Sequence, residues 1–258
     1  MSILDEIVVN LRGDAPIRKL TVGERYAAVL SRTLGVAFRF NRPCAKHRTS
    51  SPGAPHEHPE DRDSVPLPPP LSNRATDDMT ARDLATLAHS QDPLHASIGV
   101  AAISSLLDPP TGRIEDGDAA DLIADRGRGG TVTLVGHFSF VDRLRTQVQK
   151  LHVLELRPQE GDLPASAADD VIPESDVVAI TGTTLINHTM EGLLRLAQGR
   201  FVVILGPSTV LSPVLFDYGV SAICGSLVTD PEEVLRALNA GGSLRKNRGV
   251  RKLNWLRS

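Results

Sequence analysis

The chain has 258 residues, with 28 Lys and Arg against 31 Asp and Glu and a formal net charge of -3. Its length allows one large domain or two smaller ones, and its two cysteines exclude a disulfide scaffold. The near-neutral charge gives no basic footprint for nucleic acid, and no apolar run reaches the roughly 18 residues of a membrane span. The start, MSILDEIVVN, is acidic where a signal peptide is basic, so we expect a cytoplasmic protein.

The N-terminal part is predicted to begin with a helix and a small sheet. Apolar residues recur at the three-four spacing over residues 3–11, which predicts an amphipathic helix. Three short apolar runs follow at 16–23, 24–31 and 33–40, each closed by Gly or polar residues. Runs of this kind are typical of strands in a small antiparallel sheet.

Two helix starts are predicted further along the N-terminal part. Thr80 and Asp83 have the spacing of a capping box, in which each side chain bonds the backbone of the other residue. Asp92 is a good N-cap, and Pro93 is a good first residue for a helix over 93–107. The apolar face of this longer helix is expected to pack on the small sheet.

Between the predicted sheet and these helices, the composition changes over residues 42–76. The segment is dense in Pro, Ser, His and charged residues, and it cannot bury enough apolar area to offset its ordering entropy. We interpret it as an insertion in the small domain. It carries Cys44, His47, His56 and His58, whose side chains are of the type that bind zinc, copper or nickel. Their spacing matches no standard zinc finger, so adventitious exposure remains the alternative to a metal site.

The C-terminal part alternates between predicted strands and helices. Continuous apolar runs predict strands at 131–136, 151–156, 176–182, 201–206 and 220–226, with helical patterns that include 140–150 and 184–197. Strands that are buried on both faces and alternate with helices indicate a parallel, doubly wound sheet. We therefore predict an α/β protein with a small α+β domain over 1–128 and a doubly wound domain over 129–258.

Ligands of such sheets bind beyond the carboxyl ends of the strands, so the residues after each strand form the candidate site. The first turn, Gly136-His137-Phe138, lacks the three glycines of a pyrophosphate cradle. Glu155 ends the second strand. In dinucleotide and adenosyl-cofactor folds an acid at that position accepts hydrogen bonds from ribose hydroxyls, and an ordinary exposed carboxylate is the alternative.

Small hydroxyl residues stand beside glycine after the next two predicted strands. Thr181 and Thr183 follow the third strand, and Gly206, Ser208 and Thr209 follow the fourth. Backbone N–H groups at such turns suit an anion such as phosphate or carboxylate. The alternative is that Thr183 and Ser208 only cap helices, although two neighbouring turns of this kind favour a binding site.

The turn after the third strand also carries Asn187 and His188. The amide of Asn187 could meet an anionic ligand, and the imidazoles of His188 and His137 could act as acid, base or metal ligand. The sequence has no GxSxG nucleophile elbow, no HExxH zinc motif and no Walker motif. It therefore gives no reason to expect a hydrolase, a zincin or a nucleoside triphosphatase.

Several long motifs resemble, in order, the heavy-metal chelation domain family of bacteria and archaea. They are GERYAAVLS at 23–31, VGHFSFVDRLR at 135–145, the stretch LELRPQEGD…INHTMEGLL at 154–194 and VVILGPSTV…TDPEEVL at 202–235. The resemblance implies an enolase-N-terminal-like domain followed by a Rossmann-like domain, with a site in the cleft between them. The insertion at 42–76 and the histidine at position 137, where we expect a less reactive residue such as Tyr, depart from the family pattern.

Two hypotheses for the function follow. The first is a protein that handles a divalent heavy metal and binds an anionic or metal-chelating small molecule in the interdomain cleft. The second is an enzyme that uses S-adenosylmethionine, or a related adenosyl cofactor, to make or modify a metallophore-like molecule. The candidate ligand-binding residues are Gly136, His137, Phe138, Glu155, Thr181, Thr183, Asn187, Gly206, Ser208 and Thr209, and the candidate metal ligands are Cys44, His47, His56, His58 and His188. We expect a small-molecule or metal partner, no nucleic acid and no membrane; a homo-oligomer remains open.

Overall fold

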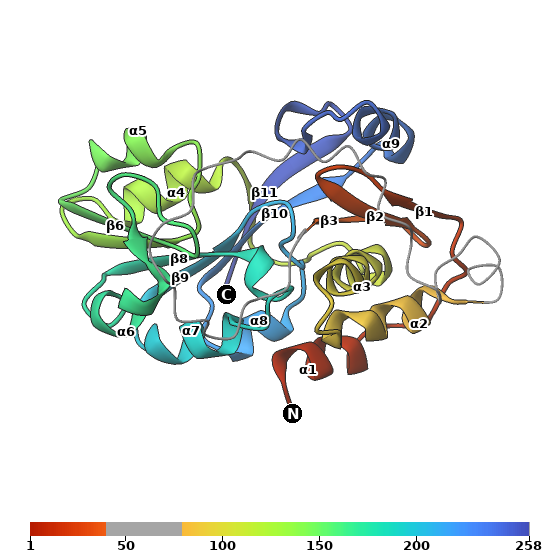
Figure 1. The fold of residues 1–258 in the computed structure, drawn as a ribbon, viewed down its shortest axis with the longest axis horizontal. Helices are drawn as coiled ribbons and strands as arrows, with labels where there is room; N and C mark the ends of the chain where they lie inside the picture. Colours follow the sequence, from red (N-terminus) through yellow and green to blue (C-terminus); the bar gives the residue numbers. More distant parts are fainter. Residues whose placement is uncertain (40–78, 258) are drawn as a thin grey trace, which may run out of the picture.

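The computed structural model describes residues 1–39 and 79–257 (Figure 1). The predicted insertion at 42–76 lies outside the described residues, and with it the candidate metal ligands Cys44, His47, His56 and His58. None of the described helices is long and apolar enough to cross a membrane.

The N-terminal unit is a small antiparallel sheet covered by helices. Its elements are α1 (Ile3–Val9), β1 (Lys19–Val22), β2 (Tyr26–Leu30), β3 (Leu34–Phe38), α2 (Ala81–Ala85), η2 (Thr86–His89) and α3 (Pro93–Leu106). The sheet has the order β1-β2-β3, and α3 packs on β2 and β3. Both predicted helix starts are confirmed: Thr80 and Asp83 form a capping box, and the Asp92 side chain accepts from two amides of the first turn of α3.

The second unit is built on a sheet of eight strands. They are β4 (Ile114–Asp116), β5 (Thr131–Val135), β6 (Lys150–Glu155), β7 (Leu163–Pro164), β8 (Val177–Thr181), β9 (Phe201–Leu205), β10 (Ala222–Val228) and β11 (Val250–Leu256), in the order β4-β11-β10-β9-β8-β5-β6-β7. From β10 to β7 all neighbours are parallel, which confirms the predicted doubly wound sheet. The unpredicted strands β11 and β4 extend this sheet in antiparallel fashion.

Helices cover both faces of the large sheet. They are α4 (Ala119–Arg126), α5 (Val141–Arg145), α6 (Ala168–Val171), α7 (Met190–Leu196), α8 (Val214–Asp217) and α9 (Pro231–Asn239), with short 3-10 turns η3 (Ala165–Ala167), η4 (Gly182–Thr184) and η5 (Leu244–Lys246). Alternate residues of β8 face opposite cores: Val177 and Ala179 pack with α4 and α5, whereas Val178 and Ile180 pack with α6, α7 and α8. This burial on both faces explains the continuous apolar runs.

Two predicted helices of this unit are shorter than the sequence pattern indicates. The pattern at 140–150 gives only α5, which ends at Arg145. The pattern at 184–197 is interrupted, because His188 has a φ of 59° and α7 begins only at Met190. A non-glycine residue in this left-handed region cannot continue a right-handed helix.

The two units share a core and several contacts. The apolar cluster of α6, α7 and α8 continues into α1, α2 and α3. On the opposite face of the small sheet, α9 packs on β2 and β3, so that the small sheet lies between α3 and α9 (Figure 1). The Phe38 N–H at the end of β3 donates to Ser208 Oγ at 2.8 Å. The end of the small sheet therefore meets the turn after β9.

Candidate functional site

The strand order reverses between β5 and β8, and this switch point is where doubly wound sheets bind ligands. Gly136 follows β5 and Gly206 follows β9, with φ angles of 107° and 108° that favour glycine. A Cβ on Gly136 would lie 3.3 Å from Thr181 Cβ and 3.4 Å from the Phe138 ring. A Cβ on Gly206 would lie 3.7 Å from Thr181 Oγ1 and 4.0 Å from that same ring. The structure thus brings Gly136, Phe138, Thr181 and Gly206 together.

His137, in the turn after β5, is held by a buried carboxylate. Its Nδ1 lies 2.9 Å from Asp162 Oδ2 and 3.1 Å from Oδ1. The Asp162 side chain is 1% exposed and also accepts from the Gln159 N–H, whereas the His137 side chain is 29% exposed. A carboxylate at Nδ1 sets the tautomer and orientation of an imidazole. His137 therefore presents Nε2 as its second functional atom.

Asp162 contacts His137 but is not among the candidate site residues that the sequence indicates. It lies immediately before β7, which pairs with the end of β6, and its contact with His137 spans 25 positions along the chain. The sequence signal is its place in the loop after the second predicted strand, the edge at which ligand contacts are expected. Nothing local in the sequence connects it to His137.

Glu155, at the end of β6, supports the same turn. Its Oε1 accepts from the His137 N–H at 2.9 Å, and its Oε2 accepts from the Leu156 N–H at 2.8 Å. Each carboxylate oxygen thus already has one backbone partner from this chain. Glu155 lies beside the switch point, as predicted from its position, and there it fixes the backbone of the β5 turn.

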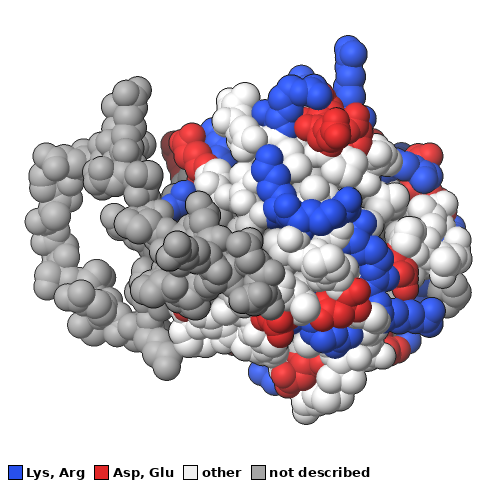
Figure 2. All heavy atoms as spheres, turned by 90° about the vertical axis from the view of Figure 1, so that its right-hand side faces the viewer, with Lys and Arg blue, Asp and Glu red and all other residues white. Residues whose placement is uncertain are grey.

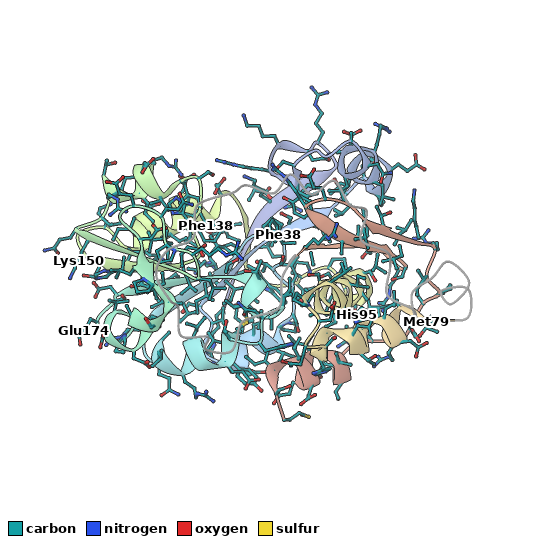
Figure 3. The ribbon with its side chains drawn as sticks, viewed as in Figure 1. Phe38, Met79, His95, Phe138, Lys150 and Glu174 are labelled. Carbon is teal, nitrogen blue, oxygen red and sulfur yellow. The ribbon has the colours of Figure 1, made fainter. Side chains whose placement is uncertain are left out.

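The hydroxyl residues of the two neighbouring turns have different partners. Thr181 caps η4: its Oγ1 lies 3.0 Å from Thr183 Oγ1 and accepts weakly from the Thr183 N–H. Ser208 is 1% exposed and holds the end of the small sheet through Phe38, so it joins the two units instead of capping a helix. The buried Thr209 Oγ1 has no hydrogen-bond partner among the described residues. In the view of Figure 3, Phe138 of the turn after β5 lies to the left of Phe38 at the end of β3.

Asn187 and His188 make contacts of another kind. Asn187 Oδ1 accepts from the N–H and the hydroxyl of Thr189, at 3.2 and 2.7 Å, and so shapes the start of α7. His188 is exposed, and its Nε2 bonds the Ser90 carbonyl of the small unit at 2.9 Å. No hydrogen bond or ion pair between described residues joins either side chain to the His137 turn.

The donor set of the described residues is small. No group of three or more His, Cys, Asp or Glu side chains within residues 1–39 and 79–257 is placed to hold a metal ion. Cys224 is a free thiol in the core, and its burial raises its pKa to about 12. A buried thiol with a raised pKa is a poor nucleophile and a poor ligand.

Comparison with known proteins places the chain. A protein of Methanocaldococcus jannaschii, "Uncharacterized protein MJ0500", is 28% identical over 178 residues, which are 66% of this chain and 69% of that protein. A solved structure from Desulfitobacterium hafniense DCB-2, titled a protein with unknown function from the DUF364 family, is 24% identical. It has a TM-score of 0.77 and covers 99% of this chain and 97% of its own.

A second solved structure of the DUF364 family, from Pyrococcus horikoshii, is 20% identical, with a TM-score of 0.74 and coverage of 99% and 98%. Both structures show a shared fold. The DUF364 family model matches residues 118–256, more than half of the chain, and the DUF4213 model matches residues 5–107. Both models carry the description "Putative heavy-metal chelation". The expected resemblance is confirmed, and the chain belongs to the DUF364 family.

Proposed function

We propose that this protein binds a small metal-chelating molecule at the switch point between β5 and β8, with the metal ion as cargo, and that His137 Nε2 supplies the protein's donor atom. The observation that carries the proposal is the His137–Asp162 pair, with Nδ1 2.9 Å from a carboxylate that is 1% exposed. The family description points to the same chemistry.

The geometry of the pair favours the imidazole tautomer in which Nδ1 carries the proton that faces Asp162. With the Nδ1 proton held by Asp162, the lone pair of the ring lies at Nε2. Imidazole nitrogen of this kind is a common ligand for zinc, copper and nickel. Glu155 fixes the His137 backbone from the other side through the N–H contact at 2.9 Å. The position of the ring is thus set by two carboxylates at the two ends of the loop between β6 and β7.

A chelate fits the described residues better than a bare ion does. Zinc needs about four ligands and the other candidate metals at least as many, yet the described residues place no group of three suitable side chains together. The remaining ligands would come from the chelator. The polar groups of the chelator would meet Thr183 and Thr209. The buried Oγ1 of Thr209 has no hydrogen-bond partner among the described residues.

The adenosyl-cofactor alternative has less support at this site. Both oxygens of Glu155 already accept backbone N–H groups of this chain, so a ribose diol would have to share them. The turn after β5 has the single Gly136 where a dinucleotide cradle has three glycines. We keep S-adenosylmethionine as a ligand to be tried beside the metal chelates.

The test is calorimetric titration of the full chain with nickel nitrilotriacetate, a chelate that leaves coordination positions for imidazole. We expect binding that is lost in H137A and retained in H89A, because His89 is an exposed histidine of the small unit. Equal binding by H137A and wild type would overturn the proposal. A variant that replaces Cys44, His47, His56 and His58 by Ala serves as second control. Binding that this variant loses and H137A keeps would move the metal site to the insertion.

A further inference from the structure

A groove outside the switch point lies where the chain leaves α9. Its volume is about 670 Å³, within the range of small-molecule sites. The lining residues are Glu233, Ala237, Gly242, Ser243, Arg245, Lys246, Asn247 and Arg248. Figure 1 shows this last part of the chain beside β11, next to the small sheet.

The groove concentrates positive charge on a chain whose net charge is -3. Three of its lining side chains are basic, and its one acid, Glu233, is already paired with Arg236. No ion pair between described residues involves Lys246 or Arg248. Asn247 Oδ1 accepts from the Gly249 N–H at 2.8 Å, which leaves the amide NH2 of Asn247 as a donor. Guanidinium, ammonium and amide groups in one groove are the donors that recognise carboxylate and phosphate.

One side chain links the groove to the turn of His137. The guanidinium of Arg245 donates to the hydroxyl of Ser139, two residues after His137. The groove itself is held in place because α9 packs Val234, Leu235 and Leu238 on the small sheet. Ser139 and His137 belong to the same turn after β5, so this turn borders both the groove and the switch point.

We propose that this groove binds the anionic part, carboxylate or phosphate, of the small molecule whose metal-chelating part meets His137. This inference rests on the proposed function for the identity of the ligand, but the groove can be tested alone. A small anion is favoured over a nucleic acid, because Lys and Arg side chains lie next to Asp and Glu across the neighbouring face (Figure 2). Polyanions are bound by extended surfaces of one sign.

The test titrates the full chain with citrate, as a carboxylate, and separately with pyrophosphate, as a phosphate, at low ionic strength. We expect K246A/R248A to weaken binding of the preferred anion by about tenfold or more, since two charged hydrogen-bond donors are lost. K246R/R248K keeps the charges and should restore binding. The matched control, K19A/R128A, removes two exposed positive charges elsewhere and should bind like wild type.

Three results would overturn the groove assignment. They are no binding of either anion, equal loss in K246A/R248A and K19A/R128A, and displacement of the anion by a single-stranded oligonucleotide that binds more tightly. The nickel chelate titration separates the two proposals. If H137A no longer binds the chelate while K246A/R248A binds the anion like wild type, the groove assignment is wrong and the proposed function is supported. If H137A binds the chelate like wild type while K246A/R248A loses the anion, the groove stands and the proposed function falls.

Discussion

At the scale of single residues, the candidate site depends on which side chains already have partners. Glu155 and Asp162 each contact the turn that carries His137 and also accept a backbone N–H from their own loop, and Ser208 holds the small sheet. Among the described residues of these turns, the His137 Nε2 and the Thr209 hydroxyl have no hydrogen-bond partner. Some residues of the predicted site thus hold the His137 turn and its neighbours in place, whereas others could bind a ligand.

This division predicts the effect of D162N. Asn keeps the shape and an oxygen that can accept from Nδ1, but it removes the charge that orients the ring. Changes to such outer partners cost about 10–100-fold in metal affinity, so we expect nickel nitrilotriacetate to bind D162N at least about tenfold more weakly than wild type. Calorimetry measures this directly. The control is D169N, an exposed acid of α6, and equal losses in both variants would refute a positioning role.

At the scale of elements, the close packing of α3 against η2 in the small unit requires a glycine at position 99. A Cβ on Gly99 would lie 2.0 Å from the Ala88 backbone nitrogen, because η2 crosses α3 at that residue without room for a side chain. We expect G99A to lower the free energy of unfolding by about 3 kcal/mol through overpacking. The helical Gly192 has its nearest such neighbour at 3.9 Å, so G192A should be neutral or stabilising by about 0.5–1 kcal/mol. Urea unfolding of both variants tests the contrast, and similar losses would contradict it.

The contact between α1 and α8 predicts a dependence on pH. The Tyr218 hydroxyl donates to Glu6 Oε1 at 2.8 Å, and its partial burial and then this hydrogen bond raise its pKa from 10.0 to about 12. Because the folded pKa lies above the unfolded one, the stabilisation is complete below pH 10 and is lost as the pH rises towards about 12. Urea unfolding should show wild type losing stability across that window and Y218F losing less. Parallel losses would show that another group titrates there.

Some helices and strands could be predicted from the sequence and others could not, depending on how far along the chain their contacts reach. The helix caps at Thr80 and Asp92 were predictable because their partners lie within three residues. The break at His188 was not, because its Nε2 contact with Ser90 spans 98 positions. The strand β11 was missed for the same reason: its pairing with β10 and β4 is non-local, and its charged residues Arg251 and Lys252 interrupt the apolar run.

At the scale of the whole molecule, the two parts of the chain that the family models match share one apolar core. The first stretch of sequence supplies the small sheet, yet α9 from the second stretch covers one face of it, and α1 packs on α8. The rule that ligands bind beyond parallel strand ends points to the turns after β5, β6, β8 and β9, and their role in ligand binding stays a prediction. The small-sheet contact at Ser208 and the charge of Arg245 beside Ser139 come from long-range packing, which no local pattern encodes.

Shared packing of this kind predicts that the chain unfolds as one cooperative unit. The apolar cluster that contains Trp255 runs from β11 through α8 to α1 and α3, and Trp255 is the only tryptophan of the chain. It is 7% exposed and contacts the Phe216 ring at 5.1 Å, so its fluorescence reports on the large unit. Hydrogen exchange of the β2 amides reports on the small unit. We expect both probes and far-ultraviolet circular dichroism to give the same urea midpoint. An earlier transition in β2 would mean that the small sheet unfolds on its own, and that the cover of α9 and the shared core do not couple the two units.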